Sequence, residues 1–364
     1  MTKLEQLIEE LCPNGVEYRK LSEVTTIERG RRVVKEQLSH DSGYPVFQNS
    51  LTPMGFHTDS NYPAETSYVI GAGAAGEIGY CKEDFWAADD CFPIVCGDSV
   101  INRYVYHFLL WQQPVLLSKV RKASIPRLSR SVIENLMIPV PPLPVQSEIV
   151  HILDNFTELT VELTVELTAR RKQYEYYRNK VLSLQSNGCK LLLKDIANTF
   201  RGEYITKSST KEGNIPVILG GQEPAYYIDK YNHEGEIVVV ARSGASAGFV
   251  SYWNERIFIT DGFGYEAKQS IVTQKYLYYI LKNIEAKLNS MKRGAGVPHV
   301  SGEALNNLEF IIPTLKEQER IVAILDRFDT LCNDISAGLP AEIEARQKQY
   351  EYYRDKLLTF KELT

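Results

Sequence analysis

An internal duplication constrains the fold of this chain more than any other feature of its sequence. Residues 146–156 read QSEIVHILDNF and residues 318–328 read QERIVAILDRF, with seven of the eleven positions identical. The heptapeptide KQYEYYR occurs at residues 172–178 and again at 348–354. A repeat of this kind indicates one structural plan written twice. The 364 residues are therefore expected to form two similar halves, each with its own core.

The segments upstream of each helical element repeat more faintly. LSEVTTIERG from Leu21 resembles LKDIANTFRG from Leu193, and IPRLS from Ile125 resembles VPHVS from Val297. The stretches between these matches have diverged widely. A constant scaffold with divergent inserts is what we expect if the two copies read different ligands.

Each half begins with a segment of mixed character. Short β-branched and aromatic runs separated by glycine-rich turns predict strands, at residues 67–70, 236–240, 249–253 and 256–260. RYVYHFLLW at 103–111 and QKYLYYILKNI at 274–284 have the apolar spacing of amphipathic helices. Both halves are therefore predicted to be α+β domains.

A long helix is predicted after each domain. Residues 145–187 contain no glycine or proline, and at ~1.5 Å per residue such a helix would be on the order of 60 Å long. The second helix starts near Thr314, and Gly338 and Pro340 should break it. Side chains expected to pack along these helices are Ile149, Leu153, Phe156, Leu159, Leu163, Leu167, Tyr174, Ile321, Leu325, Phe328 and Tyr350.

These elements predict an α+β fold in which two pseudo-repeated domains are separated by two long antiparallel helices that form a coiled-coil spacer. The expected boundaries are 1–144 for domain 1, 145–187 for spacer helix 1, 188–313 for domain 2 and 314–364 for spacer helix 2, broken near 338–340. The arrangement should be pseudo-twofold and nearly circular, with the C-terminus close to the N-terminal helix around residues 4–11.

Charge is informative only locally. The chain has 41 Lys and Arg against 46 Asp and Glu, so no global basic field points to a polyanion. Residues 118–130, SKVRKASIPRLSR, hold five cations and no acid. Because Arg and Lys neutralise phosphates and Arg can pair with guanine, we select as DNA-binding candidates Arg29, Arg31, Arg32, Lys35, Lys119, Arg121, Lys122, Arg127 and Arg130 in the first half, and Arg201, Lys207, Lys211, Arg242, Ser243, Lys292, Arg293 and His299 in the second.

Two enzyme-like motifs are considered and declined. GAGAAG at 71–76 fits GxGxxG, but a strand rather than the required helix is predicted to follow. GASAG at 244–248 fits GxSxG, with Asp261 and His299 in triad order, but here too a strand is predicted next. The Asp89-Asp90 pair has no further clustered ligands and is interpreted as a turn, not a metal site. No catalytic residue is therefore assigned.

The duplicated QxxIVxILDxF and KQYEYYR elements, the proline-rich closures before them and the run ELTVELTVELT at 158–168 together resemble the specificity subunits of type I restriction-modification systems. The resemblance implies a non-catalytic DNA-reading subunit for a complex with adenine methyltransferase and ATP-dependent endonuclease activities. Because the N-terminal residues MTKLEQLIEE carry no export signal and nowhere do 18 apolar residues occur together, the protein is expected to be cytoplasmic. Each domain would read one half of a bipartite site in double-stranded DNA, and the helices would set the spacer.

The same resemblance implies partners and cofactors. The helices would dock two methyltransferase subunits, with the helix side chains named above as the expected docking and spacer positions, and nuclease-translocase subunits would join through them. S-adenosylmethionine, ATP and Mg would be bound by those partners, not by this chain. No membrane partner is implied. An alternative left open by the residues is a DNA-independent adaptor, in which the domains bind proteins and the helices only separate them.

Overall fold

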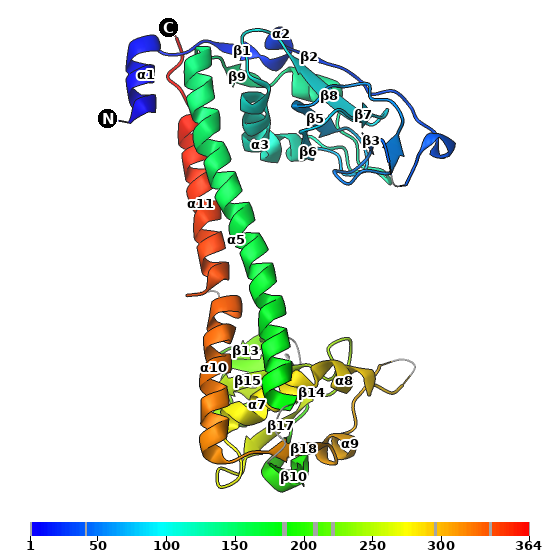
Figure 1. Ribbon diagram of the computed structural model, residues 1–364, viewed down its shortest axis with the longest axis vertical. Helices are drawn as coiled ribbons and strands as arrows, with labels where there is room; N and C mark the ends of the chain where they lie inside the picture. The colour runs from blue at the N-terminus through cyan, green and yellow to red at the C-terminus, as the bar shows by residue number, and fades with distance from the viewer. Residues whose placement is uncertain are drawn as a thin grey trace. The chain divides into compact units, whose positions relative to one another are not determined.

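The computed structural model describes residues 2–40, 42–183, 188–206, 210–219, 223–294, 297–334 and 337–363. The chain divides into two compact units (Figure 1). Unit 1 comprises Met1–Leu163 and Ile343–Thr364, and unit 2 comprises Thr164–Glu342. Unit 1 is therefore built from both ends of the sequence. Among the residues that the structure describes, none of the helices combines the length and the hydrophobicity that a membrane-spanning segment needs.

Unit 1 contains a mixed α+β domain. Its strands are β1 (Tyr18–Lys20), β2 (Thr25–Ile27), β3 (Tyr44–Phe47), β4 (Phe56–His57), β5 (Thr66–Ile70), β6 (Ile78–Cys81), β7 (Trp86–Ala87), β8 (Cys91–Cys96) and β9 (Met137–Pro139). Its helices are α1 (Lys3–Leu11), α2 (Leu21–Val24), η1 (Lys35–Gln37), α3 (Asn102–Ser118) and α4 (Arg130–Glu134). The long helix α5 (Leu143–Ser183) begins in unit 1 and continues into unit 2.

Unit 2 repeats the same plan. Its strands are β10 (Cys189–Leu192), β11 (Ala197–Arg201), β12 (Ile215–Ile218), β13 (Tyr226–Ile228), β14 (Glu236–Ala241), β15 (Val250–Asn254), β16 (Phe258–Ile259), β17 (Gly262–Ala267) and β18 (Glu309–Ile312). Its helices are α6 (Leu193–Ile196), α7 (Gln274–Asn283), α8 (Glu285–Ser290), α9 (Gly302–Asn306) and α10 (Leu315–Asn333). Helix α11 (Leu339–Leu357) follows, with all but its first residues in unit 1.

The sheet topology shows that the duplication extends through the diverged segments. The order β2-β8-β5-β6 in unit 1 corresponds to β11-β17-β14-β15 in unit 2, and β4-β3-β7 corresponds to β13-β12-β16. The small sheets β1-β9 and β10-β18 also match. The strands and the two amphipathic helices predicted from the sequence are therefore confirmed.

The central strand of each unit is buried on both faces. In β5, Val69 packs in the cluster beneath α3, while Tyr68 and Ile70 pack in a second cluster with Phe85. Since successive side chains of a strand point to opposite faces, this explains why residues 68–70 form a continuous apolar run instead of alternating with polar residues. In unit 2, β14 divides its side chains between two clusters in the same way, and α7 packs on β14, β15 and β17.

A buried glutamine fastens each domain to the helix that follows it. The Gln146 side chain accepts a hydrogen bond from the Ile101 N–H at 2.9 Å and donates to the carbonyls of Ser99 and Pro141 at 2.8 and 2.7 Å. Gln318 makes the equivalent three bonds with Thr273, Ile271 and Pro313, each at 2.9 Å. These contacts explain why the duplicated helical motif begins with glutamine.

The two heptapeptides are exchanged between the units. In unit 1, Phe156 of α5 stacks on Tyr353 of α11, with ring centroids 5.3 Å apart. In unit 2, Phe328 of α10 stacks on Tyr177 of α5 at 6.1 Å. Each ILDxF element thus packs against the KQYEYYR element that belongs to the other repeat. Figure 1 shows α11 beside the first part of α5.

The predicted proximity of the chain ends is found inside unit 1. Val16 forms a β-bridge with Glu362, and the Tyr18 hydroxyl donates to the Phe360 carbonyl at 3.1 Å. Leu4 and Leu358 belong to the same core cluster. The end of the chain therefore completes the first domain.

The second spacer helix is divided in the structure. Helix α10 ends at Asn333 and α11 begins at Leu339, and residues 335–336 lie outside the described ranges. A Cβ on Gly338 would lie 2.3 Å from the carbonyl oxygen of Thr330, so only glycine fits between these two helices.

Candidate nucleic-acid interface

The candidate surface of unit 1 is built from a glycine turn, residues 71–76, and a basic loop, residues 119–128. The turn follows β5 and is held by three backbone hydrogen bonds: Gly71 N–H to Asp90 at 2.7 Å, Gly73 N–H to Pro126 at 3.1 Å and Leu128 N–H to Gly71 at 2.8 Å. Gly73 has a φ of +81°, and a Cβ there would lie 2.8 Å from the Asn49 carbonyl oxygen. A side chain would thus open this contact.

The basic loop is closed by a reciprocal pair of backbone bonds. Arg121 N–H donates to the Arg127 carbonyl at 2.8 Å, and Arg127 N–H donates back at 3.2 Å. The loop starts where α3 ends, since Lys119 is the C-cap of that helix. This pairing fixes the backbone of a segment whose side chains are mostly exposed.

Unit 2 has the same backbone arrangement in its glycine turn, residues 244–248, and its loop at 292–300. Gly244 N–H donates to Pro298 at 3.0 Å and Val300 N–H donates to Arg242 at 2.8 Å. Arg293 and His299 exchange backbone bonds at 3.0 Å each. The faint match between IPRLS and VPHVS therefore marks structurally equivalent positions. Residues 295–296 lie outside the described ranges.

The two units differ in the side chains on this common frame. In unit 1, Arg29, Arg127 and Arg130 line a cleft of 280 Å³ together with Asp89 and Asp90. The Arg29 Nε donates to the Asp89 carbonyl at 2.8 Å. Arg130 also pairs with Glu134 at 3.0 Å. The cleft is thus of mixed charge rather than uniformly basic.

In unit 2, Lys292, Arg293 and His299 line a separate cleft of 460 Å³ that also contains Glu303. Lys292 Nζ donates to the Ala245 carbonyl at 2.7 Å and so ties the loop to the glycine turn. Beside the turn, Arg242 Nη1 lies 3.6 Å from Asp261 Oδ1, and the Ser243 hydroxyl donates to the same carboxylate.

The remaining candidate cations are placed less compactly. Arg31, Arg32 and Lys35 are exposed after β2, and Lys119 and Lys122 are exposed in the basic loop. Arg201 is exposed at the end of β11, opposite Phe263, and Lys211 is exposed ahead of β12. None of these lines the clefts described above. Lys207 lies outside the described residues.

Sequence reasoning did not select the aspartates of these sites. Asp89 and Asp90 lie in a turn, as predicted, but that turn forms part of the cleft wall. Asp90 and Asp261 each precede the equivalent strands β8 and β17, and their carbonyls accept from Gly71 and Arg242. Their position in the repeat was the available signal. Among the residues described, no group of three or more His, Cys, Asp or Glu could hold a metal ion.

The enzyme-like motifs lack the geometry that their chemistry needs. Strand β6 follows Gly76 and strand β15 follows Gly248, whereas both motifs require a helix at that point. In the described part of unit 2, the hydrogen bond to Asp261 comes from Ser243, and no bond joins Ser246 to His299.

The helix residues selected from the sequence mostly face their own unit. Ile149, Leu153, Ile321 and Leu325 are fully buried, and Tyr174 and Tyr350 are nearly so. Phe156, Leu167 and Phe328 are partly buried against the same clusters, while Leu159 and Leu163 are half-buried. The fully buried side chains stabilise helix packing and leave no surface for a partner.

The repeated units and their paired loops define a duplicated recognition protein. The chain belongs to the family of type I restriction-modification DNA specificity proteins, because the model of the type I restriction modification DNA specificity domain matches it at residues 13–170 and 190–345. The family resemblance predicted from the sequence is therefore confirmed.

Relatives match over nearly the full length. A putative type I restriction enzyme specificity subunit of Haemophilus influenzae is 34% identical, covering 99% of this chain and 98% of the relative. The Escherichia coli EcoR124I/EcoR124II specificity subunit is 30% identical, covering 99% and 97%. The crystal structure of the S subunit from M. genitalium has the same fold, with a TM-score of 0.71 at 19% identity, covering 94% of this chain and 96% of that one.

Proposed function

We propose that this chain is the DNA sequence-specificity subunit of a type I restriction-modification complex, in which each unit reads one half of a bipartite site. One observation carries the proposal: the two units hold the same loop and turn backbone but present different side chains on it. Arg127 in unit 1 corresponds to His299 in unit 2, and Gly71 corresponds to Arg242. A loop and turn backbone that is the same in both units but carries different side chains suits the recognition of two different short DNA sequences.

The charges support a division of labour within each surface. Acids inside the clefts would repel phosphates, but carboxylates accept from the cytosine amino group while Arg pairs with guanine. We therefore assign base reading to Arg29, Arg127 and Asp90 in unit 1. The exposed Arg121 and Lys122, which have no acid in their loop, are assigned to phosphates.

The helices would serve as the spacer and as docking sites. We infer that α5 runs antiparallel to α10 and α11, with the two units related by a pseudo-twofold axis, because each heptapeptide packs on the helix of the other repeat. Docking of two methyltransferase subunits is assigned to Tyr176 and Tyr352, which hold the same place in the heptapeptide and are 59% and 63% exposed. The buried Tyr174 and Tyr350 cannot serve that role.

Catalysis is assigned to the partners. The chain is proposed to contribute no catalytic residue, and S-adenosylmethionine, ATP and Mg would be bound by the methyltransferase and by nuclease-translocase subunits that join through it. Because its DNA substrate lies in the bacterial cytoplasm, the complex is proposed to act there.

The test is methylome sequencing of cells that express this chain with its methyltransferase. A bipartite, asymmetric methylated motif is expected, and its absence would refute the proposal. Purified complex should lose affinity steeply as salt rises. The double variant Arg121→Glu with Lys122→Glu should weaken binding to all sequences, whereas the matched pair Arg19→Glu with Lys20→Glu on β1 should not. An adaptor would show neither salt dependence nor a difference between the pairs.

A further inference from the structure

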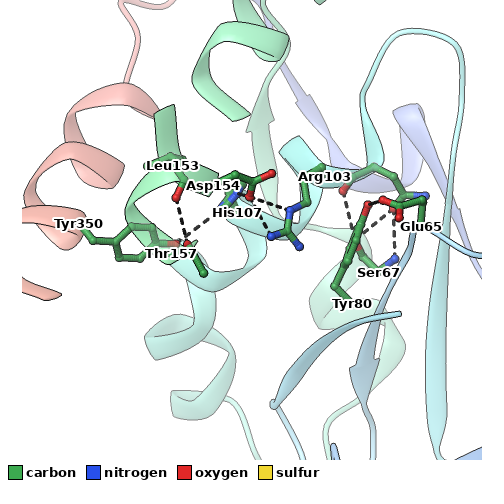
Figure 2. A network of polar contacts seen from close by, with 10 residues as sticks. Glu65, Ser67, Tyr80, Arg103, His107, Leu153, Asp154, Thr157 and Tyr350 are labelled. Carbon is green, nitrogen blue, oxygen red and sulfur yellow. Dashed lines mark hydrogen bonds and ion pairs between the residues drawn. The ribbon is translucent and has the colours of Figure 1, made fainter. Parts of the chain in front are cut away.

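A network of polar side chains joins the recognition domain of unit 1 to its helices (Figure 2). Asp154 of α5 accepts from Arg103 and His107 of α3, at 2.8 Å in each case. The other ring nitrogen of His107, Nδ1, lies 3.3 Å from the Tyr350 hydroxyl of α11. Three helices therefore meet at one carboxylate and one imidazole.

The partners define the state of the histidine. His107 is fully buried, and burial lowers its pKa despite the neighbouring carboxylate. In the neutral ring, Nε2–H donates to Asp154 and Nδ1 accepts from the Tyr350 hydroxyl, so both ring nitrogens of His107 have a hydrogen-bond partner. These two hydrogen bonds, together called the clamp below, join α3 to α5 and to α11 in a defined direction.

Arg103 extends the network onto the sheet. Its guanidinium lies over the Tyr80 ring at 4.4 Å and the Tyr106 ring at 4.7 Å. The Tyr80 hydroxyl donates to Glu65, which directly precedes β5. The open side of this network is a cavity of 690 Å³ lined by Asp154, Arg103 and Tyr80.

Unit 2 contains an equivalent network that joins α10 to α7 and the sheet, built mostly from different residues. Asp326 of α10 accepts from Lys275 at 3.2 Å and from the Tyr279 hydroxyl, both on α7. Lys275 lies over the Tyr252 ring at 4.5 Å, and the Tyr252 hydroxyl donates to Glu236. Only the aspartate of the ILD element and the tyrosine–glutamate pair are common. The two units therefore share the arrangement, although the cation on the aspartate is Arg103 in unit 1 and Lys275 in unit 2.

We propose that Asp154 and Asp326 are positioning residues that fix the angle at which each recognition domain sits on its spacer helix. The inference rests on the proposed function and adds to it a determinant of spacer length. The connection between this network and the basic loop is short. Arg103 and His107 lie near the start of α3, and Lys119, the first residue of the basic loop, is the C-cap of the same helix. In unit 2 the loop follows α8 directly, with Met291 as its cap.

A small tilt of α3 would displace the basic loop by a distance comparable to one base pair. About twelve helical residues separate His107 from Lys119, roughly 18 Å at ~1.5 Å per residue. A tilt of about 10° would move the loop by about 3 Å, which is close to the ~3.4 Å rise of one base pair. Loss of the clamp should therefore reduce the selectivity for one spacer length between the half-sites, without changing the half-site sequences that are recognised.

The test measures methylation by the complete complex with its methyltransferase on three DNAs, which carry the native spacer or one base pair more or fewer. The variants are Asp154→Asn and Asp326→Asn. Each should reduce selectivity for the native spacer by about three- to thirtyfold, with both half-site sequences unchanged. Arg103→Lys, which copies the cation of unit 2, should retain selectivity, as should Glu166→Gln, which breaks an exposed ion pair on α5.

An equal loss of methylation on all three DNAs, with selectivity unchanged, would overturn the inference and leave these aspartates as stabilising residues only. If Asp154→Asn does not fold, Arg103→Gln keeps the His107 bond and must itself lower selectivity; unchanged selectivity there would also overturn the inference. Failure of the unaltered complex to modify any bipartite site would instead refute the proposed function.

Discussion

Replacing the buried Gln146 should destabilise unit 1 and leave unit 2 intact. Gln146→Met conserves side-chain volume closely, so the change isolates the three hydrogen bonds described above. Ser99 is exposed and its carbonyl can bind water, whereas the Pro141 carbonyl is buried and the Ile101 N–H is partly so. At about 1–3 kcal/mol for each unmet buried group, the free energy of unfolding of unit 1 should fall by about 2–4 kcal/mol.

Hydrogen exchange measured by mass spectrometry on the full chain gives the opening free energy of each unit separately, which a single melting curve would not. Peptides from the β5 and α3 regions should exchange faster, while those from β14 and α7 should not. Gln318→Met is the matched control and should reverse the pattern. A loss below about 1 kcal/mol in unit 1, or equal losses in both units, would contradict the reasoning.

The buried His107, the crowded Gly30 and the repeat at residues 158–168 can each be tested by substitution or deletion. Because burial lowers the pKa of His107 from its ordinary 6.5, the unfolded chain binds a proton that folded unit 1 excludes. The free energy of unfolding of unit 1 should therefore fall as pH drops below about 6.5, by up to about 1.4 kcal/mol per pH unit. Hydrogen exchange of unit 1 peptides at pH 7 and 5.5, corrected for the intrinsic exchange rates, should show a smaller pH dependence in His107→Gln, and an unchanged pH dependence in that variant counts against the reasoning. A Cβ on Gly30 would lie 2.0 Å from the Ala88 carbonyl oxygen, so Gly30→Ala should destabilise unit 1 by about 1–3 kcal/mol, while Gly97→Ala, with its nearest atom at 3.3 Å, should be tolerated in the same exchange assay. Deleting one four-residue unit from 158–168 removes about 6 Å and turns the helix by roughly 40°, so methylome sequencing should show a changed spacer between unchanged half-sites; altered half-sites with the old spacer would refute this.

Local periodicity predicted the elements well because each is decided by short-range pattern. The spacing of Ile149 and Leu153 predicted a buried helical face, and both residues are fully buried. The apolar run in β14 predicted a strand, although not that both faces would be covered. Gly338 and Pro340 marked the place where α11 begins.

The polar networks could not be predicted because their members are distant in sequence and differ between the copies. His107 and Tyr350 are 243 residues apart, and the cation on Asp154 is arginine where Asp326 has lysine. Only the repeated ILD aspartate could have been found. The basic loops were found by composition alone, but their pairing with the glycine turns depends on backbone contacts that no charge pattern encodes.

Residues 343–363 complete unit 1, so the ribosome must synthesise all of unit 2 before unit 1 can close. Unit 2 occupies one uninterrupted stretch of chain, and it can be completed while the last helix is still inside the ribosomal tunnel. Most of unit 1 is translated before unit 2, but its Phe156 ring cannot stack on Tyr353 until α11 emerges. A frameshift that removes α11 would therefore damage unit 1, although most of unit 1 is encoded upstream of unit 2.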